Sequence, residues 1–370
     1  MCFERTKGQI GVTLNLQRLL GHIGAARSGP GAPPRAIWWP AVAALGLGLV
    51  LLAGCSVPYL PQNSLEPETE YGWKIQHLFE LILWLAAFVF VVVEGALLYT
   101  IWRYRARPGQ GRPRQIHGNT RLEIAWTIAP AVVLAVIAVP TIQTIFAIGG
   151  PPPTDSLQVE VIGHQWWWEF RYPQLNVVTA NEVHMPAGKN VSFDLKSADV
   201  IHSFWFPRLG GKRDVVPTHT YHLWLDAPQQ PAEYFGQCAE FCGASHANMR
   251  MRAFVDSQAN FDAWVKNQLA PATPPAPQVA NGSEIFQRSA CIGCHTISGT
   301  NARGEVGPNL THVGSRKSIA AGVLENTPQE MTRWIEDPEA IKPGAKMPAF
   351  KGAMSDDDIA AVVAYLQSLK

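Results

Sequence analysis

The sequence predicts a multidomain chain with a two-helix transmembrane hairpin, an all-β domain and a separate C-terminal domain. Three observations predict this organisation. Long apolar segments span about residues 75–102 and 124–148, short alternating runs fill residues 151–267, and a Pro/Ala-rich run separates these from residues 281–370. A length of 370 residues is enough for two or three domains.

The charge balance excludes one class of partner. The chain has 30 Lys and Arg against 29 Asp and Glu, a net charge of +1. A protein that binds nucleic acid usually carries a clear basic excess. We therefore expect no nucleic-acid partner.

Residues 1–55 are predicted to form an N-terminal extension with a signal-like or lipoprotein-like segment. Arg35 precedes an apolar stretch at residues 36–53, the order found in secretory signals. The stretch ends in Leu52-Ala53-Gly54-Cys55, which resembles a bacterial lipobox. Cleavage there would leave Cys55 as a lipidation site. The alternative is an uncleaved transmembrane helix with an incidental cysteine.

Residues 56–150 are predicted to form the transmembrane hairpin. Both apolar segments exceed the ~20 residues that cross a bilayer as a helix. The loop between them is rich in arginine and has no acidic residue, which places it on the cytoplasmic side. We therefore expect a multi-pass protein of the bacterial inner membrane, with everything after residue 150 on the periplasmic side.

Residues 151–267 show the pattern of a β domain. Apolar and polar positions alternate in residues 157–162 and again in residues 191–195, and turn residues such as Pro186 and Gly188 separate the runs. Evenly spaced short strands of this kind predict an all-β sandwich or Greek-key barrel. The Pro/Ala run that follows, within residues 268–280, is expected to be a stiff linker.

Two cysteines, a histidine and a methionine form a short motif near the end of this domain. Cys238, Cys242, His246 and Met249 are separated by four, four and three residues, and His202 lies upstream. Thiolate, imidazole and thioether donors together suit copper, and two thiolates can bridge two ions. A disulfide between the cysteines and a zinc site are the alternatives. The thioether argues against zinc.

The C-terminal domain contains the sequence Cys291-Ile-Gly-Cys294-His295. Two cysteines separated by two residues and followed by histidine are typical of covalent c-type haem attachment. His295 would then be the proximal axial ligand of the iron.

A sixth ligand is expected downstream on a loop. Met347 is the candidate, because Pro343, Gly344 and Pro348 favour non-helical backbone around it. The competing methionines are Met331 and Met354.

These motifs, in this order, resemble subunit II of the haem–copper cytochrome c oxidases over about residues 70–260. The resemblance implies a cupredoxin-like β domain with a binuclear copper centre, CuA. The implied ligands are His202, Cys238, Cys242, His246 and Met249, together with the backbone carbonyl of Glu240. The side chain of Glu240 is also implied to reach a magnesium ion shared with subunit I. The C-terminal domain resembles an all-α class I cytochrome c.

The same resemblance assigns roles to two further residues. Trp166, in the run Trp166-Trp167-Trp168, matches the surface tryptophan where electrons enter the copper centre. An aromatic cluster of this kind is usually core, so at least one of the three is expected to be buried. Glu123 matches a glutamate at the cytoplasmic mouth of a proton path. The alternative for Glu123 is a carboxylate favoured by the dipole of its own helix.

The sequence thus predicts subunit II of a caa3-type cytochrome c oxidase. Electrons would pass from the c haem to CuA and on to subunit I, which holds haem a and haem a3–CuB and reduces oxygen to water with proton translocation. Subunit III, the lipid bilayer and an external donor, such as a cytochrome c or the bc1 complex, are the other expected partners. The alternatives are a CuA-containing nitric oxide reductase subunit and a periplasmic copper-binding protein fused to a cytochrome.

Overall fold

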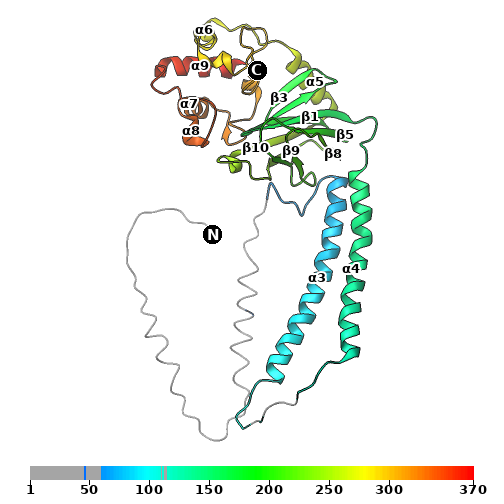
Figure 1. Cartoon of the computed structure of the whole chain (residues 1–370). Coiled ribbons are helices and arrows are strands. Elements are labelled where there is room, and N and C mark those ends of the chain that lie inside the picture. The colour runs from blue at the N-terminus through cyan, green and yellow to red at the C-terminus, as the bar shows by residue number, and fades with distance from the viewer. Residues whose placement is uncertain (1–45, 47–59, 110, 112–114) are drawn as a thin grey trace. The chain divides into compact units, whose positions relative to one another are not determined.

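The computed structural model describes residues 46, 60–109, 111 and 115–370 (Figure 1). The predicted lipoprotein-like segment and Cys55 lie outside the described residues. Within residues 60–370, two long helices precede a β domain and a mainly helical C-terminal domain. The multidomain prediction is confirmed.

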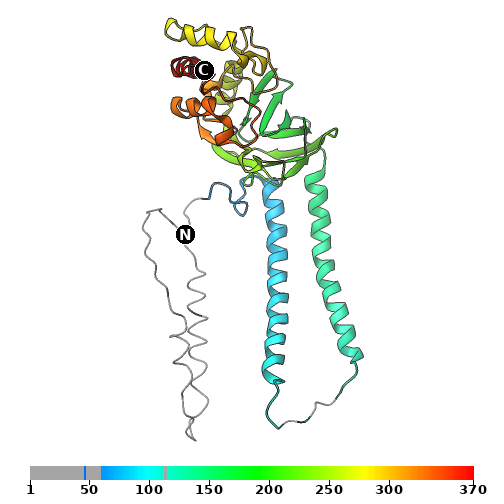
Figure 2. The same ribbon diagram turned by 60° about the vertical axis from the view of Figure 1, so that its left-hand side comes forward.

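The two long helices are α3 (Glu70–Arg103) and α4 (Thr120–Gly149), which lie side by side in both ribbon views (Figure 1 and Figure 2). They are 34 and 30 residues long and expose their large apolar side chains, so both are long and apolar enough to cross a membrane. Both begin several residues before the predicted apolar segments. The reason is capping, because Thr69 accepts a hydrogen bond from the Gly72 amide and Asn119 caps α4 in the same way.

The β domain is built from two five-stranded sheets. Their strand orders are β3-β2-β1-β5-β8 and β4-β10-β9-β6-β7. Most neighbouring strands are antiparallel, but β1 pairs with β5 and β4 with β10 in parallel. The strands are β1 (Leu157–His164), β2 (Trp167–Tyr172), β3 (Val177–Ala180), β4 (Glu182–Pro186), β5 (Asn190–Ser197), β6 (His202–Trp205), β7 (Arg213–Val215), β8 (Tyr221–Asp226), β9 (Ala232–Cys238) and β10 (Arg250–Asp256).

Large aromatic side chains fill the space between the sheets. Trp168, Phe170, Phe193 and Phe204 are at most 1% exposed, and Phe204 lies against the other three rings. Full burial of a phenylalanine contributes roughly 1.5–3 kcal/mol. Trp168 is therefore the core member of the tryptophan run, as predicted.

One helix in this region was not predicted. Helix α5 (Gln258–Leu269) follows β10 directly and begins where Ser257 caps the Asn260 amide. Its Trp264 ring stacks on His184 at a centroid distance of 4.3 Å and meets the edge of Tyr172 at 5.3 Å. The helix thus covers one end of the sandwich.

The C-terminal domain contains four α-helices in its described residues, α6 (Ala280–Arg288), α7 (Pro328–Glu336), α8 (Pro338–Ile341) and α9 (Asp356–Ser368). A two-stranded hairpin, β11 (Ser318–Ile319) with β12 (Leu324–Glu325), is added to them. The first and last helices cross closely, because a Cβ added at Gly282 would overlap the Ala361 carbonyl.

The Pro/Ala run between the two domains is not wholly free of contacts. The Ala270 carbonyl accepts a hydrogen bond from His312 Nε2 at 3.0 Å, and the Ala272 amide donates to the Ser298 carbonyl at 3.0 Å. The start of the run is therefore attached to the C-terminal domain, and a shorter piece than predicted acts as a spacer.

Candidate metal and haem sites

The predicted copper ligands meet at one end of the β domain. Cys238 ends β9, and the chain then loops back through a 3₁₀ turn, His246–Asn248, to β10. His202 begins β6, which pairs with β9 through Phe204 and Cys238. Strand pairing therefore brings His202 to the loop despite their separation in sequence.

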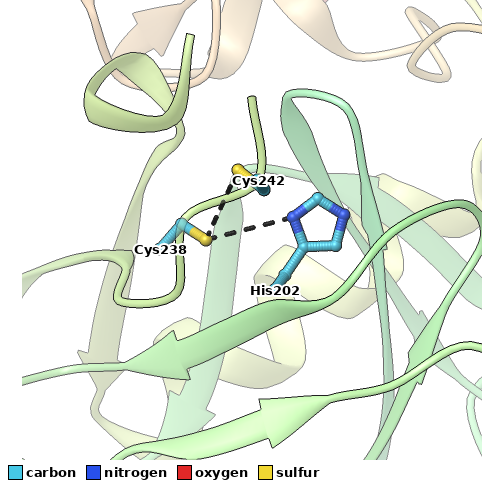
Figure 3. A group of neighbouring side chains, drawn as sticks. All are labelled: His202, Cys238 and Cys242. Atoms are coloured by element: carbon cyan, nitrogen blue, oxygen red, sulfur yellow. Dashed lines mark hydrogen bonds between the residues drawn. The ribbon is translucent and has the colours of Figure 1, made fainter. Parts of the chain in front are cut away.

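The donor atoms of this cluster lie within a few ångströms of one another. Figure 3 shows the Cys238 thiol joined by dashed lines to both the Cys242 thiol and the His202 ring. The Sγ atoms of Cys238 and Cys242 are 3.8 Å apart, so the two cysteines do not form a disulfide. These two sulfur atoms and one ring nitrogen of His202 all lie within 4.8 Å of one another. Cys242 Sγ also lies 3.6 Å from His246 Nδ1 and 3.9 Å from Met249 Sδ. The Glu240 carbonyl lies 3.2 Å from Cys238 Sγ.

Asp199 hydrogen-bonds to the His202 ring nitrogen that is not directed at Cys238. His202 Nε2 lies 2.8 Å from Asp199 Oδ1, which leaves Nδ1 directed at Cys238 Sγ, 3.9 Å away. Burial would raise the pKa of Asp199, but hydrogen bonds from His202 and from the amides of Gln165 and Val200 hold it at about 2. An ionised carboxylate behind a ligating imidazole fixes its tautomer and orientation.

The thiols of Cys238 and Cys242 form a hydrogen bond with each other. The contact with Cys242 lowers the pKa of Cys238 well below its usual range, despite burial, and the bond to His202 adds to this. The same contact raises the pKa of Cys242. One thiolate is therefore favoured by the fold itself, and the thiolate is the form that binds metal.

The haem-attachment motif lies on a short 3₁₀ turn, Ala290–Gly293, after α6. The His295 amide donates to the Cys291 carbonyl at 3.0 Å, and its Nδ1 donates to the Pro308 carbonyl at 2.8 Å. That second bond leaves Nε2 as the free ring nitrogen. Burial lowers the pKa of His295 and so favours the neutral, ligating imidazole.

These residues line a cavity whose walls come from both domains. The C-terminal domain contributes the motif and a loop with Met347. The β domain contributes His164, Gln165, Trp166, Trp167 and Asn181.

The three methionines differ in their surroundings. Met347 lies on a loop and lines the cavity. Met331 also reaches the cavity, but it is 3% exposed within α7, and its sulfur accepts a hydrogen bond from Gln367 at 3.7 Å. Met354 is not among the lining residues. Met347 is therefore the best-placed of the three candidates for the sixth ligand.

Trp166 touches both sites. It lines the cavity, and its Nε1 donates to the Cys242 carbonyl at 3.1 Å. It is only 8% exposed, because the loop around Gly344 covers the ring. The expected surface tryptophan is thus enclosed between the domains.

Two charged residues near the cavity were missed by the sequence analysis. Arg316 donates to the Asn309 carbonyl at 2.6 Å, and burial lowers its pKa to about 10. Lys342 is 4% exposed. Neither residue belongs to a recognisable sequence motif, so its position near the cavity could be found only from the structure.

Glu123 has a local role at the start of α4. Its carboxylate accepts a hydrogen bond from the Asn119 amide at 3.2 Å, while the Asn119 side chain accepts from Leu122. This reciprocal pattern resembles a capping box, with the carboxylate one residue later than usual. The helix-terminal interpretation of Glu123 is therefore supported.

Comparisons with known families agree with this organisation. Residues 62–144 match the family model "Cytochrome C oxidase subunit II, transmembrane domain", and residues 175–254 match "Cytochrome C oxidase subunit II, periplasmic domain". Residues 279–370 match "Cytochrome c". Together these families imply copper and haem c as cofactors, a membrane anchor and a subunit I partner.

Relatives of similar length carry one name. Cytochrome c oxidase subunit 2 of Alkalihalophilus pseudofirmus is 38% identical over 331 residues, which cover 87% of this chain and 94% of the relative. The subunits of the same name from Bacillus sp. and Bacillus subtilis are 34% and 33% identical, and each match covers 90% of this chain and 98% of the relative. Neither the nitric oxide reductase nor the copper-delivery alternative is favoured. The chain belongs to the cytochrome c oxidase subunit 2 family, as a caa3-type subunit II with a C-terminal cytochrome c domain.

Proposed function

We propose that this subunit accepts electrons in its C-terminal domain and passes them through Trp166 to the copper cluster, and from there to haem in subunit I. The observation that carries the proposal is the double contact of Trp166. It lines the haem cavity and donates a hydrogen bond to the carbonyl of the ligand Cys242. When bound, the haem and the copper pair supply reversible one-electron chemistry.

The donors fit a binuclear copper centre. Two thiolates, two imidazoles, a thioether and a backbone carbonyl form a soft donor set that would hold a pair of copper ions. The proposed ligands are His202, Cys238, the Glu240 carbonyl, Cys242, His246 and Met249. The unbonded thiols argue against a disulfide, and the buried thioether of Met249 argues against zinc.

The cavity between the two domains would hold a haem. We propose that Cys291 and Cys294 would attach it covalently and that His295 and Met347 would ligate its iron. The hydrogen bond from His295 Nδ1 to the Pro308 carbonyl leaves Nε2 as the nitrogen that would ligate the iron. Arg316 supplies a buried positive charge at the cavity wall, which suits the carboxylates of a haem.

The arrangement in the membrane extends the proposal. The arginine-rich loop between α3 and α4 supports a cytoplasmic position for that loop, and hence a periplasmic position for both cofactor domains. A multi-pass subunit in the bacterial inner membrane follows from this orientation, in contact with lipid, subunit I and subunit III. A soluble cytochrome c or the bc1 complex would supply the electrons.

Three residues have proposed roles at the edges of this route. Glu240, whose side chain is exposed, would share a magnesium ion with subunit I. Glu123 would stand at the entrance of a proton path in addition to capping its helix. Cys55 is the proposed lipidation site.

The electron route predicts a specific effect of Trp166→Phe. The substitution removes the hydrogen bond to the Cys242 carbonyl but keeps an aromatic ring. In the assembled oxidase, we expect electron transfer from the c haem to copper after flash reduction to slow by roughly tenfold or more, a change of about 1.4 kcal/mol in barrier.

The matched control is Trp167→Phe, because Trp167 also lines the cavity but stacks on His164 instead. Copper and haem contents are measured first, with two coppers and one haem expected per chain. A single copper per chain, or equal rates in both variants, would overturn the proposed route.

A further inference from the structure

The loop that leads to Met347 is fastened to the β domain by a buried lysine. Lys342 Nζ donates to the carbonyl of Trp166 at 2.5 Å and to the carbonyl of Ala320 at 3.1 Å. One acceptor belongs to the β domain and the other to the C-terminal domain. A lysine is rarely buried this deeply, and burial lowers the pKa of Lys342 to about 7.

Two neighbours of Lys342 hold the same loop in place. The fully buried hydroxyl of Ser245, in the ligand loop of the β domain, donates to the Pro343 carbonyl at 2.7 Å. Gly344 lies on the Trp166 ring, since an added Cβ would stand 2.5 Å from its Cη2 atom. Gly344 also has φ +82°, a conformation that favours glycine. The loop and the ring are therefore in direct contact.

A second contact between the domains lies at the β11–β12 hairpin. Glu182 in β4 is 3% exposed and accepts hydrogen bonds from the Ser318 amide and hydroxyl, at 2.8 and 2.9 Å. The Arg250 amide donates to the Ala321 carbonyl at 3.0 Å. Hydrogen bonds to backbone groups have a narrow range of distances and angles, so these contacts form in one relative position of the two domains.

Charged pairs surround this second contact. Arg252 reaches Glu233 within the β domain at 2.9 Å and Glu325 of the hairpin at 2.5 Å. Lys317 of the C-terminal domain pairs with Glu233 at 2.7 Å. Of these three pairs, Arg252–Glu233 is mostly shielded from solvent and lies within the β domain, whereas the pairs that cross to Glu325 and Lys317 each have an exposed partner and contribute little.

We propose that Lys342 is a positioning residue: it pins the Met347 loop to the backbone of Trp166, so that the C-terminal domain works from one docked position on the β domain. The inference rests on the proposed function, because it concerns the same Trp166 route. A free tether would only raise the effective concentration of one domain near the other. A docked C-terminal domain does not have to diffuse to the β domain before each electron transfer. The rate of that transfer then depends on residues such as Lys342 that hold the two domains together.

The test uses the assembled oxidase with full copper and haem content, comparing Lys342→Met with Lys351→Met. Methionine keeps most of the side-chain volume but removes both hydrogen bonds, leaving two buried carbonyls unpaired. Lys351 is an exposed lysine after the same loop. Two quantities are measured: hydrogen exchange of the Arg250 amide, and electron transfer from haem to copper after flash reduction.

For Lys342→Met we expect Arg250 exchange to be faster, and electron transfer slower, by roughly tenfold, as expected for loss of a buried hydrogen-bond pair. The haem absorption spectrum should be unchanged, and Lys351→Met should match the wild type. Wild-type exchange and transfer rates in Lys342→Met would overturn this inference but leave the Trp166 route intact. A chain without copper or haem would instead overturn the proposed function.

A second variant keeps the test valid if Lys342→Met unfolds the C-terminal domain, which loss of exchange protection in α9 would reveal. Glu182→Gln weakens the hairpin contact on the other side of the interface and does not touch the Met347 loop. Faster Arg250 exchange with α9 still protected supports a docked domain. Unchanged Arg250 exchange in Glu182→Gln overturns it.

Discussion

The copper cluster and the haem cavity differ in how much of each site the folded chain builds by itself. At the cluster, Cys242 Sγ lies 3.6 Å from His246 Nδ1 and 3.8 Å from Cys238 Sγ, so the donors already converge. At the haem site, the ligand candidates stand around a cavity of about 260 Å³. Two small ions need little space, whereas a porphyrin forms a large part of the core around it.

The copper cluster and the haem cavity also differ in which domain supplies the residues around them. The core between the two sheets of the β domain is filled largely by aromatic rings such as Phe193 and Phe204, and Cys238, Cys242 and Met249 pack into the same core. The C-terminal domain is smaller, and its cavity is completed by Trp166 and Trp167 of the β domain. We therefore expect loss of haem to damage folding far more than loss of copper.

The largest expected effect follows from replacing both attachment cysteines, Cys291→Ser with Cys294→Ser. Without haem, apolar side chains that line the cavity, such as Leu310 and Phe350, lose their packing partner, and each Å² of apolar surface left in water costs about 25 cal/mol. Hydrogen exchange of the α9 amides should therefore lose most of its protection, while β5 stays protected. Equal protection of α9 with and without haem would contradict this view.

Cys238→Ser should have an intermediate effect confined to metal binding. The hydroxyl is a poor copper ligand and cannot bridge two ions, so we expect loss of the spin signal shared between two copper nuclei. Stability of the metal-free β domain should change by no more than about 1 kcal/mol, since serine is nearly the same size as cysteine. Copper content with electron paramagnetic resonance, and thermal unfolding, measure the two effects. A β domain that unfolds in this variant would show that the cluster is part of the core.

Most of the organisation could be predicted from sequence because it depends on local patterns. The long apolar segments predicted α3 and α4, and alternation predicted the sheets. The fixed spacing from Cys238 to Met249 and the Cys-X-X-Cys-His motif identified both cofactors. Even the distant His202 could be associated with its loop, although only the pairing of β6 with β9 explains their contact.

The remaining features depend on contacts between distant segments. No local pattern indicates that Lys342 reaches the Trp166 carbonyl, 176 residues away, or that Glu182 accepts from Ser318. The same holds for the burial of Trp166, which is a consequence of the second domain covering it. Helix α5 was missed for a different reason: it is short and follows a strand directly.

The smallest effect concerns Glu169, beside the cavity wall supplied by the β domain. Its carboxylate is paired with His164, a lining residue, at 3.0 Å and with Arg171 at 2.6 Å, and its side chain is 11% exposed. Burial would raise the pKa of Glu169, but these hydrogen bonds outweigh it and lower the pKa. A lowered folded-state pKa stabilises the protein above the unfolded pKa, about 4.3.

That stabilisation should disappear as the pH falls through the lowered value in the folded state. We expect Glu169→Gln to reduce the unfolding free energy of the β domain at pH 7 by on the order of 1 kcal/mol, and the two proteins to converge as the pH falls below the lowered folded-state pKa. Asp194→Asn, at a more exposed carboxylate paired with His222, is the matched control and should change stability less. Denaturant unfolding of the β domain from pH 7 to pH 3 measures the difference. If the gap between Glu169→Gln and the wild type stayed constant over that range, the carboxylate's charge would not be its cause, and the β-domain side of the cavity would owe its stability to packing alone.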